Sequence, residues 1–136
     1  MKDAFYNRLI IASGFIGAFG VIAGAFGAHF LKSRLGETDL TTIKTGVFYL
    51  FVHVIGLVLI GIIGQVSSSS RWLKYAGISF ILGILFFSGS LFIIGTSTLT
   101  GFPVSAIGPI TPIGGFLFIT GWIALAVNGI RKRPVH

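Results

Sequence analysis

Long uncharged stretches alternate with short polar segments along the chain. The uncharged stretches span residues 9–31, 46–66, 75–95 and 111–130. Each has about the 20 residues that a helix rising about 1.5 Å per residue needs to cross a hydrocarbon core of about 30 Å. No stretch shows the alternation of apolar and polar positions expected of a membrane β-strand. Because lipid offers the backbone no hydrogen-bond partners, the pattern predicts an all-α fold, a single membrane domain over residues 1–136 that crosses the bilayer with four helices.

The connections between the predicted helices differ in character. Residues 67–70 are four consecutive serines, which predict a short flexible turn. Residues 96–110 carry no charge but contain two prolines and two glycines. We therefore expect an apolar outer loop that lies in the membrane interface or dips into the protein, where irregular backbone finds partners. Thr111 followed by Pro112 predicts the start of the last helix, with Thr111 as N-cap and proline at the first helical position.

Small residues form stripes on the predicted helices. The stripe on the first helix consists of Gly17, Gly20, Gly24 and Gly27. Their intervals of three and four residues place them on one face, and Gly114 and Gly121 share a face of the last helix. Membrane helices associate through close backbone approach, which glycine permits, so these six positions are predicted packing sites in a compact bundle. Bulky residues on the opposite stripe of the first helix, such as Phe15, are expected to face lipid or a second copy of the chain.

Composition agrees with a membrane location. Of the 136 residues, 54% are hydrophobic and 10% are charged, and the mean hydropathy is +0.97. Soluble domains usually carry about 25% charged residues. The chain contains no cysteine, which excludes disulfides, thiolate metal sites and thiol nucleophiles.

The distribution of basic residues predicts the orientation. With four spans, one side of the membrane carries Lys2, Arg8, Arg71, Lys74, Arg131, Lys132 and Arg133, whereas the other carries Lys32, Arg34 and Lys44. The positive-inside rule then places both termini and the serine turn in the cytoplasm. The net charge of +7 favours attraction to anionic lipid headgroups. A nucleic-acid partner is not expected, because topology alone accounts for the basic C-terminus.

The first predicted span has an alternative interpretation. Lys2 and Arg8 precede an apolar run that contains Ala23-Gly24-Ala25, a small-x-small site like that of a secretory signal peptide. The run is longer than the usual signal-peptide core of about 7 to 15 residues. The length favours a retained transmembrane helix.

A few polar side chains within or at the ends of the spans are candidates for function. They are His29, His53, Ser88, Ser90, Thr111 and Asn128. His53, near the centre of its span, is expected either to hydrogen-bond a neighbouring helix or to serve as a proton relay or ligand. His29 is expected to be an interfacial anchor. Two histidines without a carboxylate make a poor metal site, so we expect no metal and no cofactor.

No catalytic residue is predicted. The spans contain no Asp, Glu, Lys or Arg in their cores, which removes the common devices of ion coupling. Ser88 and Ser90 have no nearby base and acid in the sequence that would activate a serine nucleophile. Hydrogen bonds between helices are therefore the favoured role for both hydroxyls.

Several motifs occur in a fixed order along the chain. They are Gly24-Ala25-Phe26-Gly27-Ala28-His29, Tyr49 with His53, Phe87-Ser88-Gly89-Ser90-Leu91, and Ile110-Thr111-Pro112-Ile113-Gly114-Gly115 followed by Gly121-Trp122. Together they resemble the domain of unknown function 423 family of small bacterial membrane proteins, which has eukaryotic relatives. The resemblance covers the chain from Gly24 to Trp122, and Phe92 stands where tyrosine is expected.

The resemblance implies a four-helix protein of the bacterial cytoplasmic membrane and supplies no mechanism. It marks as motif positions His29, His53, Ser88, Ser90, Thr111 and Gly115.

Two functional hypotheses follow from these observations. The first is a non-enzymatic bundle that organises or stabilises the membrane through self-association, as a homo-oligomer, and through contacts with lipids or protein partners. The alternative is a minimal oligomeric transporter or channel for a small solute or protons, which would use His53 and the serine and threonine side chains. An intramembrane enzyme ranks third.

Overall fold

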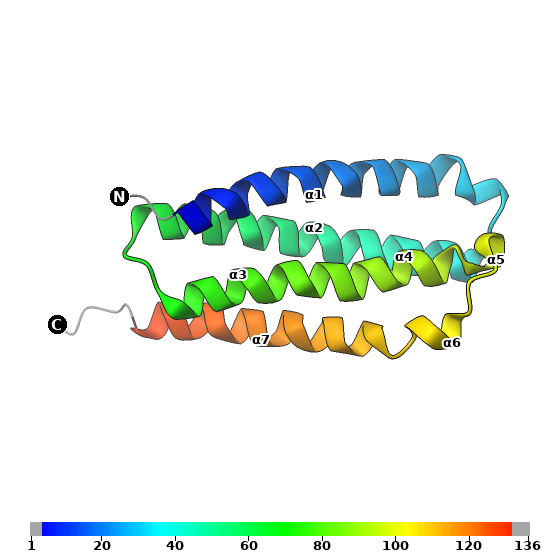
Figure 1. Ribbon diagram of the computed structural model, residues 1–136. Helices are drawn as coiled ribbons and strands as arrows, with labels where there is room; N and C mark the ends of the chain where they lie inside the picture. The colour runs from blue at the N-terminus through cyan, green and yellow to red at the C-terminus, as the bar shows by residue number, and fades with distance from the viewer. Residues whose placement is uncertain (1–3, 132–136) are drawn as a thin grey trace.

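Helices account for nearly all of the computed structural model, which describes residues 4–131 (Figure 1). In chain order they are α1 (Ala4–His29), η1 (Leu31–Ser33), α2 (Glu37–Val66), α3 (Arg71–Gly83), η2 (Ile84–Ser88), α4 (Gly89–Gly95), α5 (Ser97–Thr100), α6 (Val104–Ile107) and α7 (Ile110–Arg131). The described part of the chain has no strand. The all-α prediction is therefore confirmed.

Four helical segments are long and apolar enough to cross a membrane. They are Ala4–Ser33, Glu37–Val66, Arg71–Gly95 and Val104–Arg131. The third combines α3, η2 and α4 into one continuous rod (Figure 1). Four spans are what the uncharged stretches predicted.

The helices extend beyond the predicted boundaries at several ends. The second begins at Glu37 rather than at residue 46, and the third begins at Arg71 rather than at residue 75. Glu37 and Asp39 occupy the first turn of α2, where carboxylates stabilise the positive end of the helix dipole. Ser70 caps α3, because its hydroxyl accepts the backbone N–H of Trp72. The uncharged stretch thus indicates the part of each helix suited to lipid, whereas the capping and charged residues beyond it determine where the helix begins.

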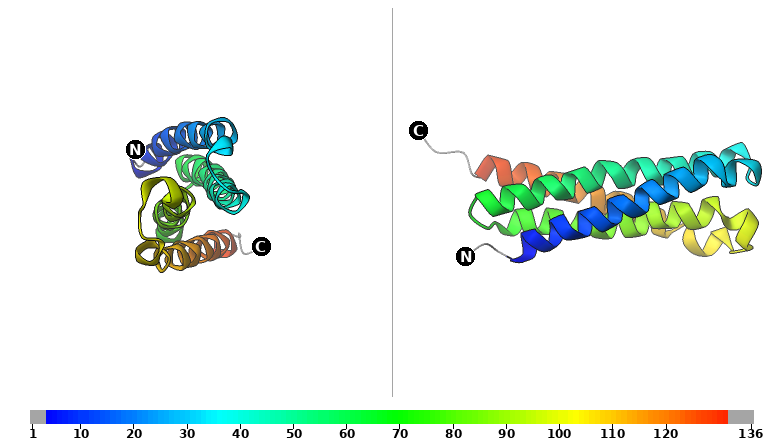
Figure 2. Two further views of the ribbon diagram at one scale, coloured as in Figure 1. Left: turned by 90° about the vertical axis from the view of Figure 1, so that its right-hand side faces the viewer. Right: turned by 90° about the horizontal axis from the view of Figure 1, so that it is seen from above.

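The helices form two antiparallel pairs that meet through their inner members. α1 packs mainly on α2, and α7 packs mainly on α3 and η2, while α2 contacts α3, η2 and α4. Seen end-on, α1 and α7 lie farthest apart (Figure 2). The outer helices consequently bury the smallest share of their surface, and they present broad apolar faces to the surroundings.

Glycines contact large side chains where the helices cross most closely. Gly20 lies against Leu50 and Phe51 of α2, and a Cβ there would lie 2.5 Å from Leu50. At Gly17 and Gly24 a Cβ would meet only ordinary contacts, each at 3.5 Å. The predicted stripe therefore faces α2, but along it Gly20 is the position that most requires the absence of a side chain.

The predicted outer loop, residues 96–110, is more ordered than expected. It contains the short helices α5 and α6, separated by Gly101 in the left-handed conformation with φ of 70°. The Thr98 hydroxyl donates to Asp39 Oδ2 at 2.9 Å, which ties the segment to the start of α2. The segment between the third and fourth spans thus consists largely of two short helical turns, and its predicted position in the membrane interface stays a prediction.

The start of the last helix also differs from the prediction. α7 begins at Ile110, so Thr111 lies inside the first turn and is not its N-cap. Its hydroxyl is instead within hydrogen-bond distance of Ser90 on α4. A side chain on the neighbouring helix thus replaces the capping role expected from local sequence.

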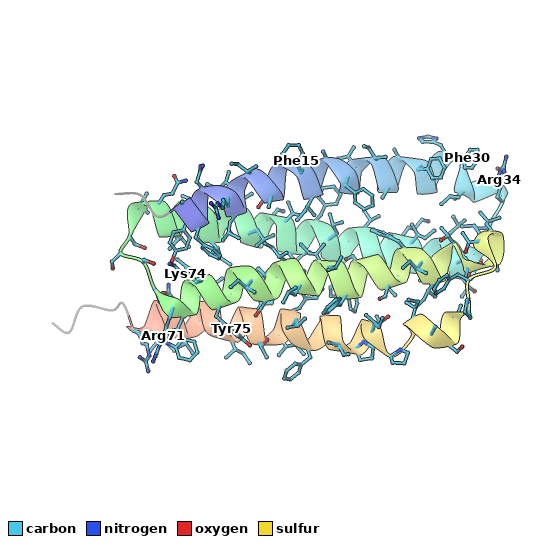
Figure 3. The ribbon with its side chains drawn as sticks, in the orientation of Figure 1. Phe15, Phe30, Arg34, Arg71, Lys74 and Tyr75 are labelled. Atoms are coloured by element: carbon cyan, nitrogen blue, oxygen red, sulfur yellow. The ribbon has the colours of Figure 1, made fainter. Side chains whose placement is uncertain are left out.

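The start of α1, the serine turn and the end of α7 lie at one end of the bundle (Figures 1 and 3). Arg71 and Lys74 are at this end (Figure 3). Arg8, near the start of α1, and Arg131, the last residue of α7, belong to it as well. The other basic residues assigned to it by sequence, Lys2, Lys132 and Arg133, lie outside the described residues. Arg34 lies at the opposite end (Figure 3).

Candidate functional site

His53 is the most enclosed of the candidate polar side chains that carry a ring. It lies in the middle of α2 with 2% of its surface exposed. The imidazole stacks on Phe118 of α7, with 3.4 Å between the ring centroids and 9° between the planes. Phe80 of α3 contacts it edge-on with a centroid distance of 5.0 Å. Aromatic side chains of α3 and α7 therefore pack against the imidazole of α2.

Both nitrogens of His53 are hydrogen-bonded. Nδ1 lies 2.7 Å from the carbonyl oxygen of Tyr49, and Nε2 lies 3.1 Å from Nε1 of Trp122. An indole N–H only donates, so Nε2 must accept and Nδ1 must carry the proton that it donates to Tyr49. The two partners together fix a neutral imidazole in the Nδ1–H tautomer.

This arrangement leaves His53 little chemistry to perform. The only basic lone pair of the neutral His53 ring is on Nε2, and it accepts the Trp122 N–H. His53 therefore has no free lone pair with which to bind a metal or to take up a proton. Together with the stacking of His53 on Phe118, the hydrogen bond links α2 to α7, two helices whose backbones approach each other at few points. Among the described residues, no three His, Cys, Asp or Glu side chains form a group that could hold a metal ion.

His29 lies in a different environment from His53. It ends α1 and is exposed, whereas His53 has its hydrogen-bond partners in α2 and α7. The structure therefore gives the two histidines different surroundings, one at the margin of the bundle and one in its interior.

Ser90 and Thr111 form a second polar link between helices. The Ser90 hydroxyl donates to the carbonyl oxygen of Phe87 at 2.8 Å, and its oxygen lies 2.7 Å from the Thr111 hydroxyl. Ser90 has a single proton, which the carbonyl receives, so Thr111 must donate to Ser90. This bond ties α4 to the first turn of α7.

Replacing Thr111 by valine should test this link. Valine keeps the shape of the side chain but leaves Ser90 without its donor. We expect a loss of about 1 kcal/mol in the free energy of unfolding, as is usual for hydrogen bonds between membrane helices. Unfolding in mixed micelles with rising denaturing detergent measures it. Thr120→Val is the control, because the Thr120 hydroxyl bonds only to Leu117 of its own helix. An equal loss in both variants would contradict the link.

Ser88 is enclosed in a different way. It lies in η2, a π-helical turn in which the N–H of Gly89 donates to the carbonyl of Ile84. None of its surface is exposed, and its hydroxyl has no hydrogen-bond partner among the described residues. Ser88 also lines an apolar groove of about 580 Å³ between α1 and the η2–α4 segment, to which Phe15 and Phe19 contribute. His53 is not among the residues that line this groove.

Asn128 and Trp72 hold two further unpaired polar atoms. The Asn128 carbonyl oxygen on α7 and the Trp72 indole nitrogen on α3 are buried, and within residues 4–131 neither has a hydrogen-bond partner. Arg131, one turn beyond Asn128, lies over the Trp72 ring. The Asn128 oxygen is an acceptor and the Trp72 nitrogen a donor, so this end of the α3–α7 contact contains one unpaired acceptor and one unpaired donor.

The aromatic enclosure of His53 was missed by local reasoning on the sequence. Trp122 was named from the sequence only as a member of the Gly121-Trp122 motif and not as a partner of His53. Its place near the middle of a span was the available signal, because tryptophan favours the interfaces and a buried indole N–H needs an acceptor. His53 was the residue in the spans best suited to accept it.

These features define a class of protein. Four long apolar helices with a few polar side chains buried between them characterise a multi-pass helical membrane protein. The family described as "Protein of unknown function (DUF423)" matches residues 23–115, and the chain belongs to that family.

Curated relatives agree with this assignment. A UPF0382 membrane protein of Staphylococcus haemolyticus is 37% identical over 123 residues, which cover 88% of this chain and 92% of the relative. One of Staphylococcus saprophyticus is 40% identical over 126 residues, covering 89% and 96%. The UPF0382 membrane protein YwdK of Bacillus subtilis is 34% identical over 84 residues, covering 56% and 68%. No solved structure matches the chain.

Proposed function

We propose that this protein is a non-enzymatic, membrane-organising bundle of the bacterial cytoplasmic membrane, with both ends of the chain in the cytoplasm. It acts through contacts with lipids and with copies of itself. The observation that carries the proposal is that the hydrogen-bonding groups of His53 and Ser90 are paired within the bundle. His53 donates to the Tyr49 carbonyl and accepts from Trp122, and Ser90 donates to the Phe87 carbonyl and accepts from Thr111. A solute path would need such groups to face water.

The lateral surface supports the self-association part of the proposal. Phe15 is 76% exposed on α1, and it stands on the rim of the groove that contains Ser88. A projecting ring beside a hollow is self-complementary. In a two-fold pair, Phe15 of each copy fills the groove of the other. Lipid chains are as apolar as the ring, so the gain comes from close packing.

Cross-linking in vesicles at several protein-to-lipid ratios tests self-association. We expect a dimer, and we expect Phe15→Ala to weaken it about tenfold, because truncation leaves unfilled volume in the interface. Phe116→Ala is the matched control, since Phe116 is similarly exposed but lies on α7. Monomers at every ratio, or equal losses in both variants, would refute pairing through α1.

Flux measurements test the absence of a path. Vesicles that contain the protein are expected to leak protons and small solutes no faster than vesicles without it, and His53→Ala should leave this unchanged. Flux that depends on His53 would instead establish the transporter alternative.

A further inference from the structure

One end of the bundle concentrates positive charge. Arg71 and Lys74 lie at the end where α1 begins and α7 finishes (Figure 3). Arg8 belongs to the same end because it is near the start of α1, and Arg131 because it is the last residue of α7. Of the three carboxylate side chains in the sequence, the two that the structure describes, Glu37 and Asp39, are in the first turn of α2 at the opposite end. We call the first of these the basic end.

Two arginines at the basic end converge on one indole ring. The Cζ atoms of Arg71, at the start of α3, and of Arg131, at the end of α7, each lie 5.6 Å from a ring centroid of Trp72. Cation–π attraction favours this placement. Guanidinium N–H groups that are not spent on a carboxylate remain able to bind a phosphate in a bidentate manner. Neither arginine forms an ion pair with a carboxylate in the described part of the chain.

A hollow lies beside these side chains. It has a volume of about 460 Å³ and is lined by Arg71, Trp72 and Tyr75. Such a volume is within the range of small-ligand sites, about 300–1,000 Å³. Tyr75 is half exposed and adds a hydroxyl donor, and α3 begins at Arg71, so the positive end of its dipole faces the same region. Arginines, a phenol and a helix start together suit an anion.

We propose that this hollow binds the phosphate group of an anionic phospholipid in the adjacent leaflet. The lipid acyl chains would lie along the apolar faces of α3 and α7. A zwitterionic lipid is disfavoured, because its own cationic group would lie near the guanidinium groups of Arg71 and Arg131, which both contact Trp72. The proposal rests on the lipid contacts of the proposed function and not on self-association, so the cross-linking and flux results leave it untouched.

Lipid titration of the purified full chain, followed by native mass spectrometry, tests the site. The probes are phosphatidylglycerol and phosphatidylcholine with identical acyl chains. We expect phosphatidylglycerol to bind at least about tenfold more tightly than phosphatidylcholine, because each basic residue near an anionic headgroup strengthens the binding of that lipid. The double variant Arg71→Gln/Arg131→Gln should lose most of this preference. The matched control Lys32→Gln/Arg34→Gln removes the same charge from the other end and should keep it.

Two further arms separate a built site from general attraction. Arg71→Lys/Arg131→Lys preserves charge but not the planar fork, so its preference should fall by about threefold or more. Its thermal unfolding, compared with the wild type, guards against misfolding in the glutamine variant. Excess inorganic phosphate should not displace the lipid, because it lacks acyl chains. Equal binding of the two lipids, equal losses in the control, full retention by the lysine variant or displacement by phosphate would each overturn the proposal.

Discussion

Replacing Gly114 by alanine is expected to destabilise the bundle by about 3 kcal/mol, near the upper end of the usual cost of overpacking. A Cβ at this position would collide with the backbone nitrogen of Phe87 and lie 2.8 Å from the carbonyl carbon of Phe86. Both atoms belong to η2, whose π-helical turn is wider than an α-helix and brings the backbone against α7. Backbone atoms cannot rotate aside as a side chain tip can, so α7 must move outward as a whole.

The adjacent glycine provides the control for this experiment. A Cβ at Gly115 would meet Phe87 ring atoms at 3.8 Å, an ordinary contact. Gly115→Ala should therefore be neutral or slightly stabilising, as alanine favours helix. Thermal unfolding in the same detergent distinguishes the two variants. If Gly114→Ala unfolds at the wild-type temperature, the close approach of η2 and α7 is wrong.

The second large effect is expected at the His53–Trp122 hydrogen bond. His53→Phe leaves the Trp122 N–H without an acceptor, and Trp122→Phe leaves Nε2 of His53 without a donor. Trp122 is 42% exposed, but in a span its N–H would face apolar side chains or lipid chains, which offer no replacement acceptor. Each unpaired group should therefore cost about 2 kcal/mol. The double variant should cost about 1 kcal/mol less than the sum of the two, which is the coupling energy typical of hydrogen bonds between membrane helices.

A parallel cycle serves as its control. Trp72→Phe removes an indole N–H that has no described partner, and it should add independently to His53→Phe. Detergent-induced unfolding of all variants gives the two coupling energies. Coupling of similar size in both cycles would mean that the His53 bond contributes nothing specific.

The spans could be predicted from the sequence because the cost of placing a charged side chain in lipid depends on that residue alone and not on the fold. A helix without charged side chains is stable in lipid wherever it lies, so residues such as those from 46 to 66 could be assigned without a fold. The helix ends were less accessible. Whether α2 starts at Glu37 depends on acidic residues at its dipole, and whether Thr111 caps α7 depends on Ser90, which is distant in sequence.

The site shows the same division between local and tertiary information. His53 and Ser90 were identifiable as polar groups within apolar spans. Their partners were not, because Trp122 and Phe118 reach His53 only through the register between α7 and the other helices. The π-helical turn at Ser88 was also unpredicted, since nothing in Phe86-Phe87-Ser88 distinguishes it from an ordinary helical segment.

Single cysteines test whether the chain forms a four-span bundle with a core closed to water, because the chain has no cysteine of its own. Ser33→Cys, Ser68→Cys and Ser79→Cys place a thiol in η1, in the serine turn and in the core of α3, where Ser79 is 2% exposed. With a membrane-impermeant thiol reagent, Ser33→Cys and Ser68→Cys should react from opposite sides of the membrane, and Ser79→Cys from neither. Labelling of the first two from the same side, or rapid labelling of Ser79→Cys, would contradict the account.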